Sequence, residues 1–308
     1  MSLIDIGRLE LETVVHGAPG SPVILLIQGL GTPLTRWPAG LVERLTAAGF
    51  RVIAFDNRDS GLSTRMDVFG LPDIQQMFPG VLSALSVLPA PISISIPYTL
   101  ADMAADAVGL LDAIGVEAAH IVGASLGGMV AQLIAIHYPG RCLSLTSIMS
   151  SSGNPLLPPA TPAALHALFA PLPGARDEAS LIEDSIWRQK VLMSPAYPAP
   201  DEELYAMFAS EYRRGGFYPA GVIRQSLALL AAGDRRAQLM TIQVPTVVLH
   251  GIEDPLINIA CGRDTAAAIA GSEYRPIPGM GHDFPKALAG EFASAILSAA
   301  QHRQHGKT

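Results

Sequence analysis

The chain has 308 residues, which is enough for one large domain that carries an inserted subdomain. Hydrophobic residues make up 49% of it and charged residues only 15%, so we expect a large core and an apolar cleft. The formal net charge of −7, without any basic run, argues against nucleic acid as a partner.

The sequence shows no sign of export or of membrane insertion. The N-terminus is acidic and lacks the apolar run of a signal peptide. The most apolar long window, residues 81–97, is interrupted by prolines and is too short to span a bilayer. Cys142 and Cys261 are too few for a disulfide framework, and we interpret both as packing residues. We therefore predict a cytoplasmic protein that binds no membrane. The sequence is compatible with a homo-oligomer.

The first third of the chain alternates predicted strands with predicted helices. Residues 4–15 alternate loosely between apolar and polar side chains, which predicts an antiparallel hairpin. The continuous apolar run 22–27 predicts a strand buried on both faces, and residues 50–55 predict another. Residues 37–48 and 100–114 have helical patterns. The aspartates of the second helix are spaced as a solvated stripe, formed by Asp102, Asp106 and Asp112.

The segment 118–138 has the strongest signal in the sequence. Its apolar run 119–122 predicts a buried strand, GASLG follows at 123–127, and an apolar helical run completes it. A strand that turns sharply into a helix through G-x-S-x-G is a nucleophile elbow, with Ser125 here at the apex. The glycines allow backbone to pass closely, and the N–H groups at the helix start favour negative charge. The alternative is that Ser125 only caps the helix.

The remaining strands and helices complete a sheet of the α/β class. Strands are predicted at 143–149, 244–250 and 274–277, and a last helix at 292–300. Strands that alternate with helices indicate an open, mostly parallel sheet covered on both faces. In such sheets the ligand site lies beyond the carboxyl ends of the strands.

Residues 150–238 interrupt this alternation. The segment is rich in proline and contains helical pieces but no strand-like run. We interpret it as a helical cap over the carboxyl edge of the sheet, a place from which lids control access to a site. The predicted organisation is therefore a core of residues 1–149 and 239–308, with the cap inserted between its two parts.

Two loops late in the chain supply the acid and the base that a nucleophilic serine needs. In this fold the acid and then the histidine follow the serine along the chain. Asp254 comes directly after the predicted strand 244–250, and His282 lies in a glycine-flanked loop after the last strand. Glu253 is the second choice of acid. The alternative is that Asp254 is only a turn residue and His282 only a surface loop residue. The other histidines are not expected to be catalytic: His16, His120, His137, His166, His250, His302 and His305.

Two backbone N–H groups are candidates for an oxyanion hole. One belongs to Leu126, the residue after the predicted nucleophile. The other belongs to Leu30, in the glycine-rich loop after the strand 22–27. The alternative for this loop is a simple turn between a strand and a helix. The sequence has no zinc-ligand spacing, and we predict neither a metal nor a cofactor.

These motifs resemble those of the α/β-hydrolase superfamily over nearly the whole chain. The segments that carry the resemblance are ILLIQGLG (24–31), FDNRDSGLST (55–64), GASLGG (123–128), HGIEDP (250–255) and GMGHDFP (279–285). Within the superfamily the chain is similar to capped esterases, a group that includes aclacinomycin methylesterases, proline iminopeptidases and related carboxylesterases. The resemblance implies the α/β-hydrolase fold with a mostly parallel central sheet and a helical cap. It also implies that Ser125 is the nucleophile, Asp254 the acid and His282 the base. The oxyanion donors implied are Leu30 and Leu126.

The chain departs from the family at Gln28, where a histidine is usual. We expect this difference to affect the hydrogen bonds of the loop more than the chemistry. Serine at position 125 disfavours the subclasses that use an aspartate nucleophile. The segment 64–98 belongs either to the mouth of the pocket or to the surface.

The predicted function is the hydrolysis of carboxylic esters by a serine esterase. Apolar side chains in the cap, among them Met193, Met207 and Phe208, favour a small hydrophobic ester as the substrate. The same triad also serves C–C bond hydrolysis, lactone opening and perhydrolysis, which are the alternative reactions. A non-catalytic binder of small molecules is the third hypothesis, because a fold does not fix a function.

Overall fold

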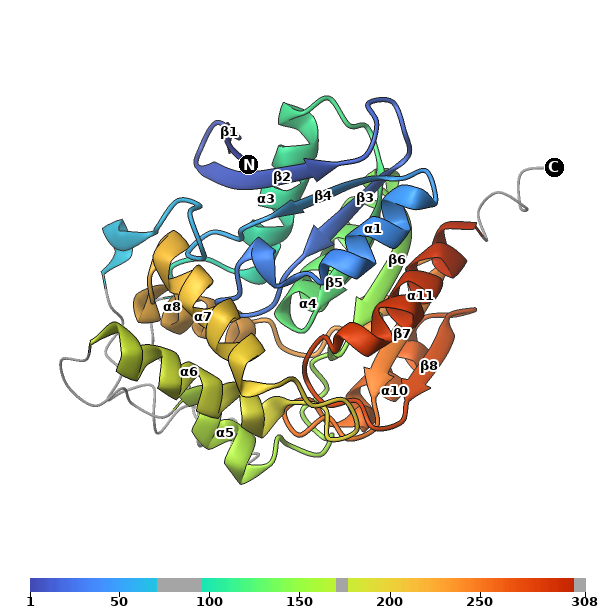
Figure 1. Ribbon diagram of the computed structural model, residues 1–308. Helices are drawn as coiled ribbons and strands as arrows, with labels where there is room; N and C mark the ends of the chain where they lie inside the picture. Colours follow the sequence, from blue (N-terminus) through green and yellow to red (C-terminus); the bar gives the residue numbers. More distant parts are fainter. Residues whose placement is uncertain (71–95, 170–176, 302–308) are drawn as a thin grey trace.

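A mixed sheet forms the centre of the structure, a computed structural model that describes residues 1–70, 96–169 and 177–301. Within these ranges the sheet has eight strands, in the order β1-β2-β4-β3-β5-β6-β7-β8 (Figure 1). β1 and β2 form the predicted antiparallel hairpin, β2 also pairs antiparallel with β4, and all later pairs are parallel. The strands are β1 (Ser2–Asp5), β2 (Glu10–His16), β3 (Val23–Ile27), β4 (Arg51–Phe55), β5 (Ala119–Ala124), β6 (Cys142–Ile148), β7 (Thr246–Gly251) and β8 (Glu273–Ile277).

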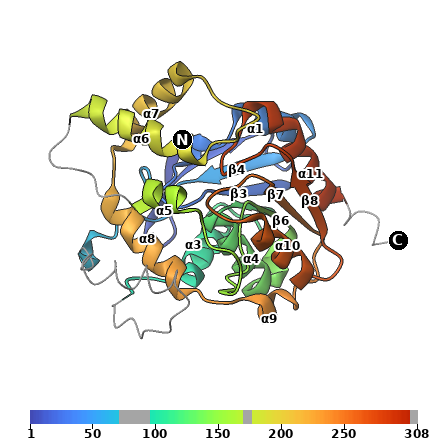
Figure 2. The same cartoon turned by 90° about the horizontal axis from the view of Figure 1, so that it is seen from below.

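Helices cover both faces of the sheet. Figure 2 shows α1 and α11 on one face and α3 and α4 on the other. The helices are α1 (Ala39–Ala47), α3 (Leu100–Ala113), α4 (Leu126–His137), α5 (Pro162–Phe169), α6 (Glu178–Leu192), α7 (Asp201–Gly215), α8 (Pro219–Ala231), α9 (Arg236–Leu239), α10 (Ile259–Ala268) and α11 (Ala289–Gln301). Short 3-10 turns occur at Leu34–Arg36, Asp67–Phe69, Pro139–Arg141 and Lys286–Leu288. This is the predicted α/β-hydrolase architecture.

Strand β3 explains why the sheet is covered on both faces. All of its residues are buried, as the apolar run predicted. Leu25 and Ile27 pack into the core beside α3 and α4, whereas Ile24 and Leu26 pack on the opposite side beside α1 and α11. Because successive side chains of a strand point to opposite faces, a strand with helices on both sides must be apolar at every position.

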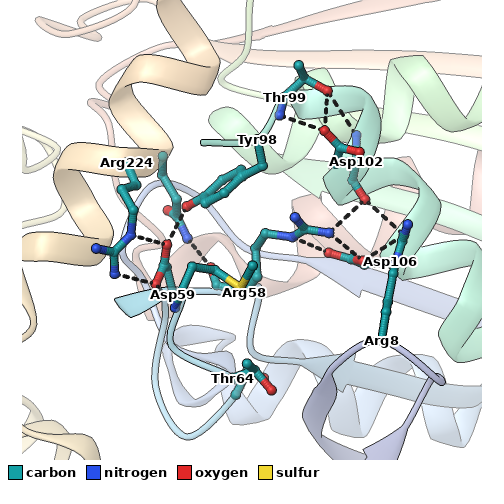
Figure 3. Close-up of polar contacts among 12 residues, drawn as sticks. Arg8, Arg58, Asp59, Thr64, Tyr98, Thr99, Asp102, Asp106 and Arg224 are labelled. Atoms are coloured by element: carbon teal, nitrogen blue, oxygen red, sulfur yellow. Dashed lines mark hydrogen bonds and ion pairs between the residues drawn. The ribbon is translucent and has the colours of Figure 1, made fainter. Parts of the chain in front are cut away.

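The predicted aspartate stripe of α3 is wrong at one position. Asp112 is exposed as expected, and Asp102 forms a capping box with Thr99 at the start of the helix. Asp106 is only 1% exposed, and its carboxylate accepts two hydrogen bonds from the guanidinium of Arg58 (Figure 3). A carboxylate can be buried there because a cation from the loop after β4 compensates its charge.

The helices α5 to α8 lie together beside one end of the sheet, within the segment predicted as a cap (Figure 1). The division into core and cap stays a prediction. Of the segment 64–98, residues 71–95 lie outside the described residues, so its two alternative places, the pocket mouth and the surface, both stay predictions. Helix α10, which starts at the N-cap Asn258, is not predicted by the hydrophobic pattern, because its sequence is mostly small residues. None of the helices in the described ranges is long and apolar enough to cross a membrane.

Candidate active site

Ser125 lies at the sharp turn between β5 and α4, as the elbow motif predicts. Its backbone has φ +55° and ψ −121°, a strained conformation for a residue with a side chain. A Cβ on Gly123 would lie 2.0 Å from the carbonyl oxygen of Gly127, and a Cβ on Gly127 would lie 2.1 Å from the carbonyl oxygen of Ile27. Glycine is therefore required at both positions. The hydroxyl of Ser125 makes no capping hydrogen bond to the helix, which removes the alternative of a simple cap.

The three side chains predicted as a triad form one continuous hydrogen-bond path. Nε2 of His282 lies 3.1 Å from Oγ of Ser125, and Nδ1 of His282 lies 2.7 Å from Oδ2 of Asp254. Asp254 follows β7 and His282 follows β8, so adjacent loops at the carboxyl edge of the sheet bring them together. The other oxygen of Asp254 accepts the N–H groups of Leu256 and Ile257 at 2.9 and 2.8 Å, which fixes the orientation of the carboxylate.

Asp254 is held in its ionised form. Burial by itself raises the pKa of this carboxyl, but the charge of His282 and a hydrogen bond from His250 lower it more, and the net pKa lies well below the ordinary value. An ionised acid beside Nδ1 keeps the proton of the imidazole on that nitrogen and leaves Nε2 free to take a proton from Ser125.

His250 is a neighbour of the acid that the sequence did not single out. Its side chain is fully buried, and Nε2 lies 3.5 Å from Oδ2 of Asp254. Nε2 also donates a hydrogen bond to the carbonyl of Ile257 at 2.7 Å, which fixes the proton on that nitrogen. His250 therefore supports the loop that carries the acid and makes no hydrogen bond to Ser125. The only sequence signal was its place at the end of a predicted strand next to Asp254.

Glu253, the second choice of acid, is not part of the hydrogen-bond path through His282. Glu253 is exposed, and its carboxylate accepts the N–H of Gly279 at 2.6 Å. Among the other histidines in the described ranges, His120 is buried beside Ser144, as expected for a packed residue, and the exposed ones are His16, His137 and His166. His302 and His305 lie outside the described residues. Both cysteines are buried and neither forms a disulfide, in agreement with a packing role.

The end of α6 and the segment that follows it hold the loop of His282. The N–H of His282 donates to the carbonyl of Leu192 at 2.7 Å, and the N–H of Gly281 donates to Oγ of Ser194 at 2.8 Å. The hydroxyl of Ser194 in turn donates to Asp283. Burial raises the pKa of Asp283, although the hydrogen bonds from Ser194 oppose this shift. These contacts come from residues far apart in the sequence and left no local pattern to detect.

The predicted oxyanion donors lie next to Ser125. A Cβ on Gly29 would be 3.2 Å from Cβ and 3.7 Å from Oγ of Ser125, so the loop after β3 touches the serine directly. In the described part of the chain, the N–H groups of Leu30 and Leu126 donate to no other residue. Both groups are thus free to bind an oxygen that carries negative charge beside the serine.

The loop is held without the histidine that is usual in the family. Oε1 of Gln28 accepts the N–H of Gly29 at 3.1 Å, and the carbonyl of Gln28 accepts a hydrogen bond from Nδ2 of Asn57 at 2.9 Å. Nε2 of Gln28 is buried and has no partner among the described residues. The substitution therefore changes the contacts at this position and leaves the turn itself intact.

Ser125 and His282 open into a cavity of about 930 Å³. Apolar side chains from the predicted cap dominate its wall, among them Leu165, Leu168, Leu204, Met207, Leu229 and Leu230. Of the apolar cap side chains singled out in the sequence, Met207 lines this cavity, whereas Met193 and Phe208 do not. The cationic side chain of Arg36 in the wall is paired with Glu211 at 2.6 Å. The volume is at the upper end of the range for ligand sites, and the wall is suited to an apolar molecule.

Residues 1–70, 96–169 and 177–301 contain no group of three or more His, Cys, Asp or Glu side chains that could hold a metal ion. The arrangement of Ser125, His282 and Asp254 needs no metal to activate a hydroxyl, because the imidazole can act as the base. With two free N–H groups beside the serine, these residues can attack a carbonyl carbon and stabilise the oxyanion that forms.

Comparison with known proteins identifies the family and the fold. The family model described as alpha/beta hydrolase fold matches residues 22–285. Rhodomycin D methylesterase DnrP of Streptomyces peucetius is 28% identical over 299 residues, which cover 92% of this chain and 92% of that protein. The structure of a hydrolase from Pseudomonas aeruginosa PA01 is 27% identical, with a TM-score of 0.68 over 97% of this chain and 98% of its own. The enol-lactonase from Burkholderia xenovorans LB400 is 22% identical and shares the fold, with a TM-score of 0.69 over 96% of this chain and 98% of its own.

Proposed function

The chain belongs to the α/β-hydrolase fold family, and on that basis we propose that it is a serine hydrolase that cleaves carboxylic esters through an acyl-enzyme. The observation that carries the proposal is the hydrogen-bond path from Ser125 through His282 to Asp254, with distances of 3.1 and 2.7 Å. The similarity to a methylesterase over 92% of the chain supports an ester as the substrate.

In the first half of the reaction, Oγ of Ser125 attacks the acyl carbon while Nε2 of His282 takes the hydroxyl proton. The charge of Asp254 stabilises the imidazolium that forms. The N–H groups of Leu30 and Leu126 bind the oxyanion of the tetrahedral intermediate. When the intermediate collapses, the bond to the alcohol breaks, and His282 gives its proton to the leaving oxygen.

In the second half, a water molecule replaces the alcohol. His282 takes a proton from the water as its oxygen attacks the acyl carbon, and a second tetrahedral intermediate forms in the same oxyanion hole. Its collapse breaks the bond to Ser125, and the proton returns to Oγ. The carboxylic acid leaves, and the enzyme regains its first state.

The cavity indicates the kind of ester. An apolar wall and a volume of about 930 Å³ favour a hydrophobic acyl or alkoxy group that is larger than acetate. Arg36 is neutralised by Glu211, so it gives little preference for an anionic substrate. We expect the ratio kcat/KM to rise from acetyl to longer acyl chains, because each buried methylene contributes about 0.8 kcal/mol.

The test is turnover of p-nitrophenyl esters of increasing chain length by the purified protein and by Ser125→Ala. We expect the substitution to lower kcat by about 10⁶-fold. A fluorophosphonate probe should label Ser125, as located by mass spectrometry, in the parent and not in the variant. Ser151→Ala is the matched control, because Ser151 lines the same cavity but has no hydrogen bond to His282. An unaltered rate in Ser125→Ala would disprove the proposal.

A substrate panel separates the ester reaction from the other reactions that the same triad serves. It contains an open-chain ester, a lactone and a vinylogous diketone of similar size. The proposal expects the open-chain ester to have the highest kcat/KM. Turnover of the lactone or the diketone without turnover of the ester would contradict it while leaving the role of Ser125 intact.

A further inference from the structure

Helix α8 carries a fully buried glutamine, Gln225, whose side chain contacts two loops of the core. Its Oε1 accepts the N–H of Gly31 at 2.7 Å, and its Nε2 donates to the carbonyl of Arg58 at 2.7 Å. Gly31 follows β3 and Arg58 follows β4, so one side chain joins the two loops. Because a backbone N–H can only donate and a carbonyl can only accept, the orientation of the amide is fixed.

The backbone of α8 approaches these loops as closely as glycine allows. Gly31 has φ +61°, and a Cβ there would lie 2.6 Å from Cγ2 of Val222. A Cβ on Gly221 would lie 2.1 Å from the carbonyl oxygen of Asp59. Arg224, which is fully buried, donates to both oxygens of Asp59 at 2.8 and 2.7 Å (Figure 3). Lifting α8 from the core would break this buried ion pair, so the helix is a fixed wall of the site.

The peptide that carries the N–H of Leu30 lies between two anchored groups. On one side, the carbonyl of Gln28 accepts a hydrogen bond from Nδ2 of Asn57 at 2.9 Å. On the other side, the N–H of Gly31 is bound by Gln225. With both neighbours held, the plane of the intervening peptide has little freedom to rotate. The bond to Gln225 also removes Gly31 as an oxyanion donor and leaves Leu30 as the free donor of this turn.

We propose that Gln225 is a positioning residue for the oxyanion hole. It fixes the turn of Leu30 so that the backbone N–H points to the place where the oxyanion forms beside Ser125. The residue touches neither the substrate nor the reacting atoms, and its effect passes through the backbone of Gly31. This role rests on the proposed function, since it concerns the oxyanion of the same reaction.

The test compares Gln225→Met with Tyr218→Phe. Methionine keeps the length of the side chain and removes both hydrogen bonds. Tyr218, at the start of α8, has a hydroxyl that accepts a hydrogen bond from Arg224 and donates to Asp67, so Tyr218→Phe also loosens the helix but leaves Gly31 bound. Removal of a direct oxyanion donor costs about 10²- to 10³-fold in kcat, so misplacement of one should cost roughly 10- to 100-fold.

For Gln225→Met we expect kcat to fall by roughly 10- to 100-fold while KM stays within about a factor of two of the parent. The reason is that the bond from the Leu30 N–H to the oxyanion, which Gln225 positions, forms only in the transition state. The rate of fluorophosphonate labelling should fall in parallel, because the phosphonyl oxygen uses the same hole. Tyr218→Phe should keep kcat even if its Tm falls as much. A kcat in Gln225→Met equal to that of the parent, or an equal loss of kcat in both variants, would overturn the positioning role.

A second measurement needs no variant. Hydrogen exchange of the whole protein should show that the amide of Gly31 is protected, although it lies in a loop. Exchange at the rate of an exposed amide would contradict the bond to Gln225. Failure of the probe to label Ser125 in the parent would instead overturn the proposed function, so the two failures are distinguishable.

Discussion

Asp106 of helix α3 and Arg58 of the loop after β4 form a bidentate ion pair inside the protein. Nε of Arg58 lies 2.5 Å from Oδ2 of Asp106, and Nη2 lies 2.7 Å from Oδ1. The side chain of Arg58 is only 6% exposed and that of Asp106 only 2%. Arg8, from the turn between β1 and β2, approaches Oδ1 of the same carboxylate to 2.8 Å (Figure 3). Together with Arg8, the pair thus joins three parts of the chain that are distant in sequence.

The first prediction concerns the stability that this pair supports. Arg58→Met should lower the free energy of unfolding by about 3 kcal/mol, because it leaves Asp106 buried with only the half-exposed Arg8 as a partner. Urea unfolding measures the change. Asp112→Asn is the control, since the Asp112–Arg141 pair lies at the surface and should contribute less than about 1 kcal/mol. Equal losses in the two variants would contradict a buried role for Arg58.

The aspartates of α3 show where local patterns stop being informative. The helix itself was predictable, because its apolar positions recur with helical spacing and Thr99 with Asp102 forms a capping box. The burial of Asp106 was not, because it depends on a cation that the fold brings from another loop. For the same reason the roles of Ser194 and Gln225 left no pattern in the sequence, and the only signal for His250 was its place at the end of a predicted strand beside Asp254.

The parts of the site that could be predicted have local or topological causes. The elbow glycines are required by contacts within a few residues of Ser125 and by the neighbouring strand β3. Asp254 and His282 could be located because each follows a strand of the sheet, and the fold places those strand ends side by side. The wall of the cavity could not be predicted, because its residues come from helices whose packing is set by tertiary contacts.

The second prediction separates the two candidate acids. Asp254→Asn should lower kcat by roughly 10⁴-fold, because the amide favours the wrong tautomer of His282. Asparagine still has Oδ1 to accept the N–H groups of Leu256 and Ile257, so the loop should keep its shape. Steady-state kinetics and Tm measure the two effects. Glu253→Gln should leave kcat nearly unchanged, and a larger loss in this variant than in Asp254→Asn would reverse the assignment.

The third prediction tests the close approach of Gly29 to the nucleophile. The Cβ of Gly29→Ala would lie 3.2 Å from Cβ of Ser125, so the two loops must move apart by a few tenths of an ångström. We expect kcat to fall by roughly 10- to 100-fold, because small displacements of reacting groups are costly. The comparison is Gly140→Ala, where a Cβ meets nothing within 4 Å. The idea fails if Gly29→Ala is as active as Gly140→Ala.

The fourth prediction concerns Asp283, next to the base. Burial raises the pKa of this carboxyl above its ordinary value, even though the hydrogen bonds from Ser194 lower it. A raised pKa in the folded state means that the ionised form is disfavoured by folding, so the protein loses stability as pH rises through that pKa. Asparagine cannot ionise but still offers an oxygen to Ser194. Asp283→Asn should therefore raise Tm at neutral pH, and the gain should disappear as pH approaches about 3.9, where the unfolded chain binds the proton as well.

Asp177 provides a comparison of opposite sign. Hydrogen bonds from Ser180 at the start of α6 lower the pKa of this exposed carboxyl. Its stabilising effect is present above the unfolded pKa and is lost as pH falls through the folded one, so Asp177→Asn should lower Tm at neutral pH and not in acid. Thermal unfolding of the parent and both variants across this pH range tests the two signs together. A gain for Asp283→Asn that does not change with pH would show that its cause is packing and not the charge of the buried carboxylate.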